Sequence, residues 1–233
     1  MLETLPFSYP DDDDVRYLEW FGKDFASVFV ALNSFLRLPG FPPYRNGDWV
    51  PAEVVEAAKK RGPDCGVSWA EIAGLCGFPS ARHVNRALRL TGSKRIDPEY
   101  ANREDTEKLL RICAENGIYP PDEGRPSPLF ELSLGQFLTA LGQEEVILAD
   151  HFGVLPVSRA TAEFLDRDRI VGFGELYAKD RSLYVANYID YDHYLVCQTG
   201  ESLARARPDA YFEGFYAGET TDDCWGIGIL DGD

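Results

Sequence analysis

The sequence predicts an α+β protein with a mainly helical N-terminal half and a C-terminal half built on an antiparallel sheet with flanking helices. Capped, amphipathic segments dominate the first half, whereas segments rich in aromatic and β-branched residues, separated by turn residues, dominate the second. The Pro-rich stretch 119–128 lies between them. We therefore predict a helical region over 1–118, a linker over 119–128 and an α+β region over 129–233.

In the first half, caps and breaker residues set the predicted boundaries. The apolar stretch 15–38 is ambiguous between helix and strand, because residues 28–36 fit either period poorly, and the breaker-rich stretch 39–48 is predicted as a loop. Pro51 opens a predicted helix that runs to about Lys60, because proline suits the first turn of a helix. Another helix is predicted over 103–116, where Asn116-Gly117 closes it.

The second half alternates between helical and strand patterns. Helices are predicted over 129–141 and over 158–165, the latter opened by Ser158 as a cap, with a strand over 145–150 between them. Aromatic and β-branched residues then predict antiparallel strands within 174–178, 183–189, 193–197 and 211–216. The hairpin connections are expected at 179–182 and 190–192.

Composition favours a globular protein of the cytoplasm. The 233 residues are 45% hydrophobic and 13% aromatic, which is enough for a sizeable core. No apolar run is long enough to cross a bilayer, and the first residues lack the charged and apolar regions of a secretory signal. The five cysteines are scattered and form no Cys-x-x-Cys pair, so free thiols in a reducing compartment are expected.

Residues 68–92 carry the signals of two short helices joined by a tight turn. Ser68 and Glu71 form a capping box at the start of the first helix. Gly77 stands where that helix needs a left-handed residue to end. The segment resembles the helix-turn-helix of bacterial regulators, in which an Ala, here Ala73, precedes the turn Gly by four residues. It departs from the most frequent form because Val84 follows Gly77 by seven residues rather than six.

The same region reverses the charge of the chain. Between Lys59 and Arg95 eight bases face two acids, so this window carries +6, while the formal net charge of −16 leaves −22 for the rest. If the segment binds DNA, base edges would be contacted by Arg82, Asn85 and Arg86, and phosphates by Arg89, Lys94 and Arg95. The acidic remainder disfavours DNA, because phosphate attraction supplies most non-specific affinity. An electrostatic match within the protein, or with a protein partner, is the preferred interpretation.

Acids and a histidine near the C-terminus offer a weaker hypothesis, a metal-dependent hydrolase. Carboxylate and imidazole groups suit zinc or manganese, but their spacing matches no recognised ligand motif. Hairpin aspartates that bond their own backbone are the alternative. No catalytic residue and no cofactor is assigned. The candidate ligands are Asp190, Asp192, His193, Asp222 and Asp223.

The aromatic end of the chain is the candidate protein-binding face. Tyr and Trp are favoured anchors in interfaces, and nearby acids could form a rim that caps a basic partner, as acidic immunity-type proteins do with toxins. A sheet core with tyrosine hydroxyls at its edge is the alternative interpretation. The residues proposed for the interface are Tyr191, Tyr194, Tyr216 and Trp225.

The order of features along the whole chain supports one family resemblance. An apolar N-terminal segment and a Pro-rich loop precede the helix start Val67-Ser68-Trp69, and the sequence Glu213-Gly-Phe-Tyr216 precedes Glu219-Thr-Thr221 and Trp225. This order resembles an uncharacterised bacterial family, domain-of-unknown-function family 2711, and the resemblance implies no activity. We expect non-enzymatic binding of a macromolecule, with a protein partner ahead of DNA and without a membrane.

Overall fold

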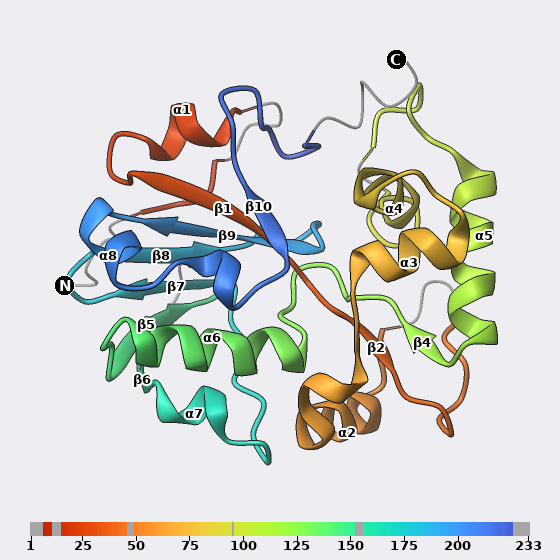
Figure 1. Ribbon diagram of the computed structural model, residues 1–233, viewed down its shortest axis with the longest axis horizontal. Helices are drawn as coiled ribbons and strands as arrows, with labels where there is room; N and C mark the ends of the chain where they lie inside the picture. The colour runs from red at the N-terminus through yellow and green to blue at the C-terminus, as the bar shows by residue number, and fades with distance from the viewer. Residues whose placement is uncertain (1–6, 11–14, 46–48, 95, 152–155, 226–233) are drawn as a thin grey trace.

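A computed structural model describes residues 7–10, 15–45, 49–94, 96–151 and 156–225 (Figure 1). Within these residues seven strands form one antiparallel sheet in the order β10-β1-β9-β8-β7-β5-β6. The α+β class predicted from the sequence is thereby confirmed. The strands are β1 (Ser27–Leu32), β5 (Glu145–Ala149), β6 (Val157–Ala160), β7 (Glu175–Ala178), β8 (Leu183–Ala186), β9 (His193–Gln198) and β10 (Gly214–Tyr216).

Eight helices and a second, smaller sheet are described in addition to the large sheet. The small sheet has the order β3-β2-β4, with β2 (Phe35–Arg37), β3 (Gly66–Val67) and β4 (Ile118–Tyr119). The helices are α1 (Tyr17–Phe21), α2 (Ala52–Arg61), α3 (Trp69–Cys76), α4 (Ala81–Leu88), α5 (Arg103–Glu115), α6 (Pro128–Ala140), α7 (Ala162–Leu165) and α8 (Gly200–Arg205). Short 3₁₀ turns occupy Gly62–Cys65 and Pro208–Ala210.

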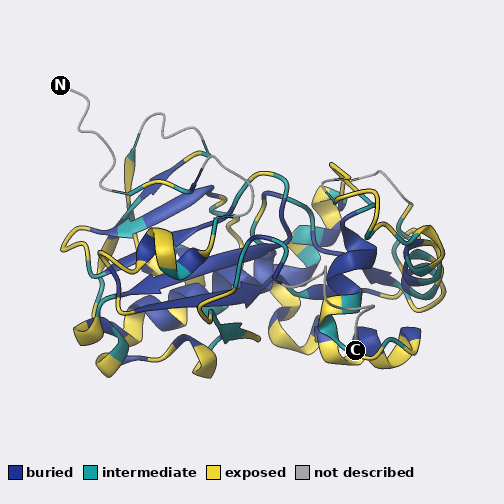
Figure 2. Ribbon diagram, turned by 90° about the horizontal axis from the view of Figure 1, so that it is seen from above, coloured by how far each residue is buried: buried dark blue, intermediate teal, exposed yellow. Residues whose placement is uncertain are grey.

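The large sheet is buried on both faces. Phe29 and Ala31 of β1 pack with α6 and α7, whereas Val28, Val30 and Leu32 pack on the opposite face with α1 and with the core of α3, α4 and α5. Figure 2 shows these strands as mostly buried and the outer faces of the helices as exposed. A strand covered on both faces has no polar side, which explains why its sequence fits no amphipathic period.

The N-terminal half is less helical than predicted, because β1 is an inner strand of the large sheet. It pairs with β9 from Ser27↔Gln198 to Leu32↔His193 and with β10 on its other side. Strands from both sides of the predicted linker therefore share one sheet. In Figure 1 the chain continues from β1 into β2, which leads from the large sheet towards α3, α4 and α5.

Most local predictions are confirmed, and one helix begins later than predicted. The Ser68 hydroxyl accepts the Glu71 N–H at the start of α3, and Gly77 ends that helix with φ 63°, in the left-handed region. Ser158 lies in β6 and pairs with Ile147 of β5, so the predicted helix over 158–165 is wrong in its first residues. Strand pairing overrides the local cap signal there, and α7 begins only at Ala162.

Candidate functional site

Most of the polar face of α4, to which the alternative DNA hypothesis assigned base contacts, faces the interior, while Arg82 is exposed. Asn85, Arg86 and Arg89 are buried, with Arg89 only 1% exposed. Arg86 pairs with Asp105 of α5 at 2.9 Å between Nη2 and Oδ2. The Arg89 guanidinium donates to the Asp223 carbonyl at 2.6 Å and lies 4.2 Å from the centroid of the Tyr191 ring. Buried side chains cannot reach base edges, so in this conformation the three are structural.

Of the three remaining residues of the DNA hypothesis, two lie among the described residues. Arg82 and Lys94 are exposed, and Arg95 lies outside the described residues. Of the bases between Lys59 and Arg95 that the structure describes, three are buried, namely Lys59, Arg86 and Arg89. Lys59 forms a fully buried ion pair with Glu131, and Arg86 pairs with the partly exposed Asp105.

The aromatic residues proposed as a protein-binding face belong mostly to the core. Tyr191, Tyr194 and Trp225 are buried, and only Tyr216 is partly exposed. Tyr194 stacks on Phe130 of α6 at 4.5 Å between ring centroids, which places it in the contact between sheet and helix. Of these four, only Tyr216 offers any exposed surface to a partner.

A polar cluster lies between the large sheet and the N-terminal residues that cover it. The Tyr17 hydroxyl joins His193 Nε2, at 3.0 Å, to the Tyr9 hydroxyl, at 2.9 Å. Burial lowers the pKa of His193 well below its usual value, and nearby Arg89 acts in the same direction. The Tyr191 hydroxyl donates to the Asp223 carboxylate, and burial raises the pKa of Tyr191 far above its usual value. The cluster therefore consists of a neutral imidazole and neutral phenols.

The five candidate metal ligands do not assemble into a centre. Among the residues that the structure describes, no three His, Cys, Asp or Glu side chains are placed to hold a metal ion. His193 bonds Tyr17, and Asp223 accepts from Tyr191. Asp192 is buried elsewhere, near Asp122 and Glu123, where burial raises its pKa well above the usual value. The sequence grouped these residues by type, and the fold gives them different neighbours.

Residues that carry the family resemblance meet at the start of α3. The Glu213 carboxylate accepts the N–H groups of Trp69, at 3.0 Å, and Ala70, at 3.3 Å. The Trp69 indole N–H donates to the Asn33 carbonyl at 2.7 Å, and its ring lies 5.8 Å from that of Trp225. A carboxylate at a helix N-terminus satisfies free N–H groups and complements the helix dipole. These contacts have a structural role, because they attach the start of α3 to residues next to β1 and β10.

A cleft of about 770 Å³ opens where five distant parts of the chain meet. Its walls are Ser34 and Leu36 at β2, the start of α2 with Val50, the segment 120–128, residues 150–151 after β5, and the loop 170–174. Leu36, Val55 and Phe173, with several prolines, give it a largely apolar lining. Pockets for organic ligands have this size and character, with a few placed polar groups.

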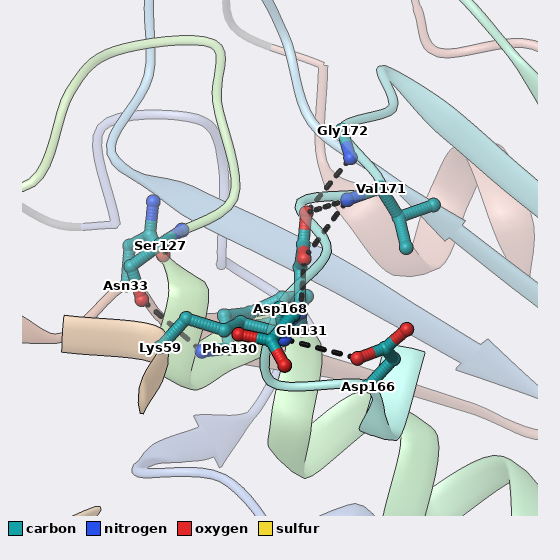
Figure 3. Close-up of polar contacts among 9 residues, drawn as sticks. All are labelled: Asn33, Lys59, Ser127, Phe130, Glu131, Asp166, Asp168, Val171 and Gly172. Carbon is teal, nitrogen blue, oxygen red and sulfur yellow. Dashed lines mark hydrogen bonds and ion pairs between the residues drawn. The ribbon is translucent and has the colours of Figure 1, made fainter. Parts of the chain in front are cut away.

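A buried ion pair fixes one wall of this cleft (Figure 3). Lys59 of α2 and Glu131 of α6 have fully buried side chains and lie 2.5 Å apart from Nζ to Oε2. Glu131 also accepts the backbone N–H groups of Val171, at 3.1 Å, and Gly172, at 2.8 Å. One carboxylate thus holds α2, α6 and the loop 170–174 together, and that loop lines the cleft.

Asn33 and His151 fix the opposite wall, the segment 120–128. The Asn33 side chain donates to the Arg125 carbonyl at 2.6 Å and accepts the Ser127 N–H at 2.8 Å, as Figure 3 shows for Ser127. The two ring nitrogens of His151 face the carbonyl oxygens of Gly124, at 2.8 Å, and Asn187, at 3.2 Å. These hydrogen bonds, of which the one to Ser127 is buried and the others are partly buried, hold the irregular segment in one conformation.

Five charged or titratable side chains line the cleft: Glu56, Asp122, Arg125, Asp150 and His151. Asp122 accepts the Val50 N–H at 3.0 Å, and burial raises its pKa to about 6, although that hydrogen bond and Arg125 oppose the rise. The Arg125 guanidinium lies 4.3 Å from the centroid of the exposed Trp49 ring. Acidic groups therefore outnumber the arginine and the histidine at the mouth.

Sequence reasoning did not find this cleft. The breaker signals of 119–128 indicated a linker, and nothing local to Glu56 or Asp150 indicated that their segments meet. One signal was present, because a Pro-rich stretch that contains a Gly and three charged residues is typical of a loop that carries function as well as of a linker.

One comparison with known proteins identifies the family. The model of a family described as a protein of unknown function, DUF2711, matches residues 13–227. The chain therefore belongs to this family. Neither the curated proteins nor the solved structures include a match to it. Among the described helices, none combines the length and apolar character needed to cross a membrane.

Proposed function

We propose that this member of the DUF2711 family is a non-enzymatic binding protein that holds an organic ligand in the cleft. The observation that carries the proposal is the cleft itself, about 770 Å³ in volume and largely apolar. Its walls are held by hydrogen bonds of Asn33, Glu131 and His151 to the backbone. Such pre-organisation lowers the ordering cost of binding.

Binding is proposed rather than catalysis because the polar groups of the cleft hold the backbone. The two His151 nitrogens face backbone carbonyls, and Asp122 accepts a backbone N–H. A general base or nucleophile needs an activating neighbour within hydrogen-bond reach of a reacting group. The contacts of His151 and Asp122 serve the fold instead.

The test is to fill the cleft without disturbing the fold. Ala52 is exposed at the start of α2 and lines the cleft, so Ala52→Trp should occlude it at little cost to the core. Leu75→Trp, at an exposed position of α3, is the matched control. A fragment library of neutral, cationic and anionic aromatic compounds is screened by saturation-transfer NMR. We expect fragments that bind the wild type and Leu75→Trp but not Ala52→Trp. Fragments that bind all three proteins equally, or no binding fragment at all, would contradict the proposal.

A second candidate is a basic protein partner, as in the immunity-type hypothesis. The observation that favours it is the formal net charge of −16, together with Trp49 and Ile170, which are 57% and 41% exposed. Ile170 lines the cleft, and Trp49 lies beside Arg125 at its edge. Basic polypeptides should then bind the wild type more weakly at high salt than at low salt. They should also bind Trp49→Ser and Ile170→Ser more weakly than they bind the wild type. Equal binding by wild type and both variants would exclude this surface.

A further inference from the structure

The charges that line the cleft point to one class of ligand. Glu56 and Asp150 belong to different walls of the cleft, and Asp122 lies on a third. A ligand in the cleft therefore meets carboxylates from three separate segments of the chain. Acidic groups gathered in a cleft raise the local concentration of cations.

The basic side chains of the cleft, Arg125 and His151, are fewer than its acids. The Arg125 guanidinium lies over the exposed Trp49 ring, and the ring nitrogens of His151 face the carbonyl oxygens of Gly124 and Asn187. Acidic side chains are therefore the majority among the charged and titratable groups that line the cleft.

We propose that the ligand of the cleft is a small organic cation, an amine or guanidine on an apolar body. The inference rests on the proposed function and adds the charge of the ligand to it. Apolar atoms would pack on Leu36, Val55 and Phe173, while the cationic group would lie among the carboxylates. A free small molecule is the occupant we commit to, because a volume of about 770 Å³ falls within the range of small-molecule pockets.

The experiment compares three probes that share one apolar body. These are 1-naphthylmethylamine, 1-naphthylmethanol and 1-naphthylacetate, titrated against the full chain near neutral pH. We expect the amine to bind at least about ten-fold more tightly than the alcohol, and the carboxylate to bind most weakly. All binding should be lost in Ala52→Trp.

Variants separate the role of local charge from that of net charge. Glu56→Gln and Asp122→Asn should each lower the affinity for the amine several-fold while leaving the affinity for the alcohol unchanged. Glu107→Gln changes the net charge equally but lies exposed on α5, away from the cleft, and should change neither.

The outcomes distinguish this inference from the proposed function. If the alcohol or the carboxylate binds as tightly as the amine, and Ala52→Trp abolishes that binding, the inference fails and the proposed function stands. If no probe binds, both fail. If an acetylated tetrapeptide of alternating Phe and Lys binds the cleft more tightly than the amine, the small-molecule commitment is overturned in favour of a protein segment.

Discussion

At the scale of single residues, the buried pair Lys59–Glu131 is the most costly polar feature to disturb. Both side chains are fully buried, so removal of one charge leaves the other without its partner in a dry environment. We expect Lys59→Met to lower the free energy of unfolding by about 3–5 kcal/mol, as measured by urea denaturation.

The neighbouring Lys60 supplies the control for this prediction. It lies on the same helix, but its pair with Asp168 is exposed and 3.6 Å long. Lys60→Met should change the stability by less than about 1 kcal/mol. Equal losses of unfolding free energy in the two variants would show that burial of the Lys59–Glu131 pair does not explain the effect of Lys59→Met.

Glu175 of β7 gives a prediction for the pH dependence of stability. Burial raises its pKa to about 7, and nearby Asp150 adds to the rise, whereas Tyr184 and the Tyr9 N–H act in the opposite direction. An unfolded glutamate titrates at about 4.3, so between that pH and about 7 the folded state holds the proton more tightly. The contribution of Glu175 to stability is therefore fully present at low pH and is lost as the pH rises through 7.

Glu175→Gln removes this titration. We expect the variant to gain stability relative to the wild type as the pH rises from about 4.5 to about 7, with a constant difference above that range. Urea denaturation at a series of pH values measures it, with Glu107→Gln as the exposed control. A difference between Glu175→Gln and the wild type that does not vary with pH would contradict the assignment.

At the scale of elements, local sequence signals predicted an element correctly where residues next to it in sequence form its ends. Helix α3 has the Ser68 cap and the left-handed Gly77 that its sequence predicted. By contrast, β1 could not be assigned, because burial of both its faces removes the periodicity. Ser158 gave a helix cap signal that pairing with β5 overrides. Sequence patterns describe one element at a time, and these elements depend on neighbours distant in sequence.

The start of α3 offers a prediction at this scale. Ser68 caps the helix from within, and Glu213 caps it from the residues before β10. Ser68→Ala and Glu213→Ala should each lower the free energy of unfolding by about 1 kcal/mol, and the loss for Glu213→Ala should shrink at high salt because it involves a charge. Glu219→Ala, exposed beyond β10, is the control. A salt-independent loss for Glu213→Ala would contradict the electrostatic explanation.

At the scale of the whole molecule, the basic stretch of the sequence is divided between the surface and the interior, with Lys60, Arg61, Arg82 and Lys94 exposed. The basic stretch that suggested a DNA-binding face sends Lys59, Arg86 and Arg89 into the interior, where acidic or carbonyl groups from other elements meet them. The preferred hypothesis of an electrostatic match within the protein agrees with these contacts. Sequence could supply the charges, but only the fold decides which of them remain at the surface.

The candidate site is also a property of the whole molecule. Its walls come from residues 34–36, 50–56, 120–128, 150–151 and 170–174. Sequence patterns assigned these separately, as part of an ambiguous apolar stretch, a helix start, a linker and the end of a strand, and they predicted no element over residues 166–173. The linkages that bring them together, Lys59 with Glu131 and Asn33 with Ser127, join residues 72 and 94 positions apart. Without homologous sequences to reveal such pairs, one sequence could not predict the cleft.

The central claim is that the cleft between α2, the segment 120–128 and the loop 170–174 binds an organic ligand. The most direct measurement is a map of backbone amide chemical shifts on titration with 1-naphthylmethylamine. We predict saturable shifts confined to residues 34–36, 50–56, 120–128, 150–151 and 170–174, with none in Ala52→Trp. Shifts centred on α3 and α4, or shifts that persist unchanged in Ala52→Trp, would contradict the claim.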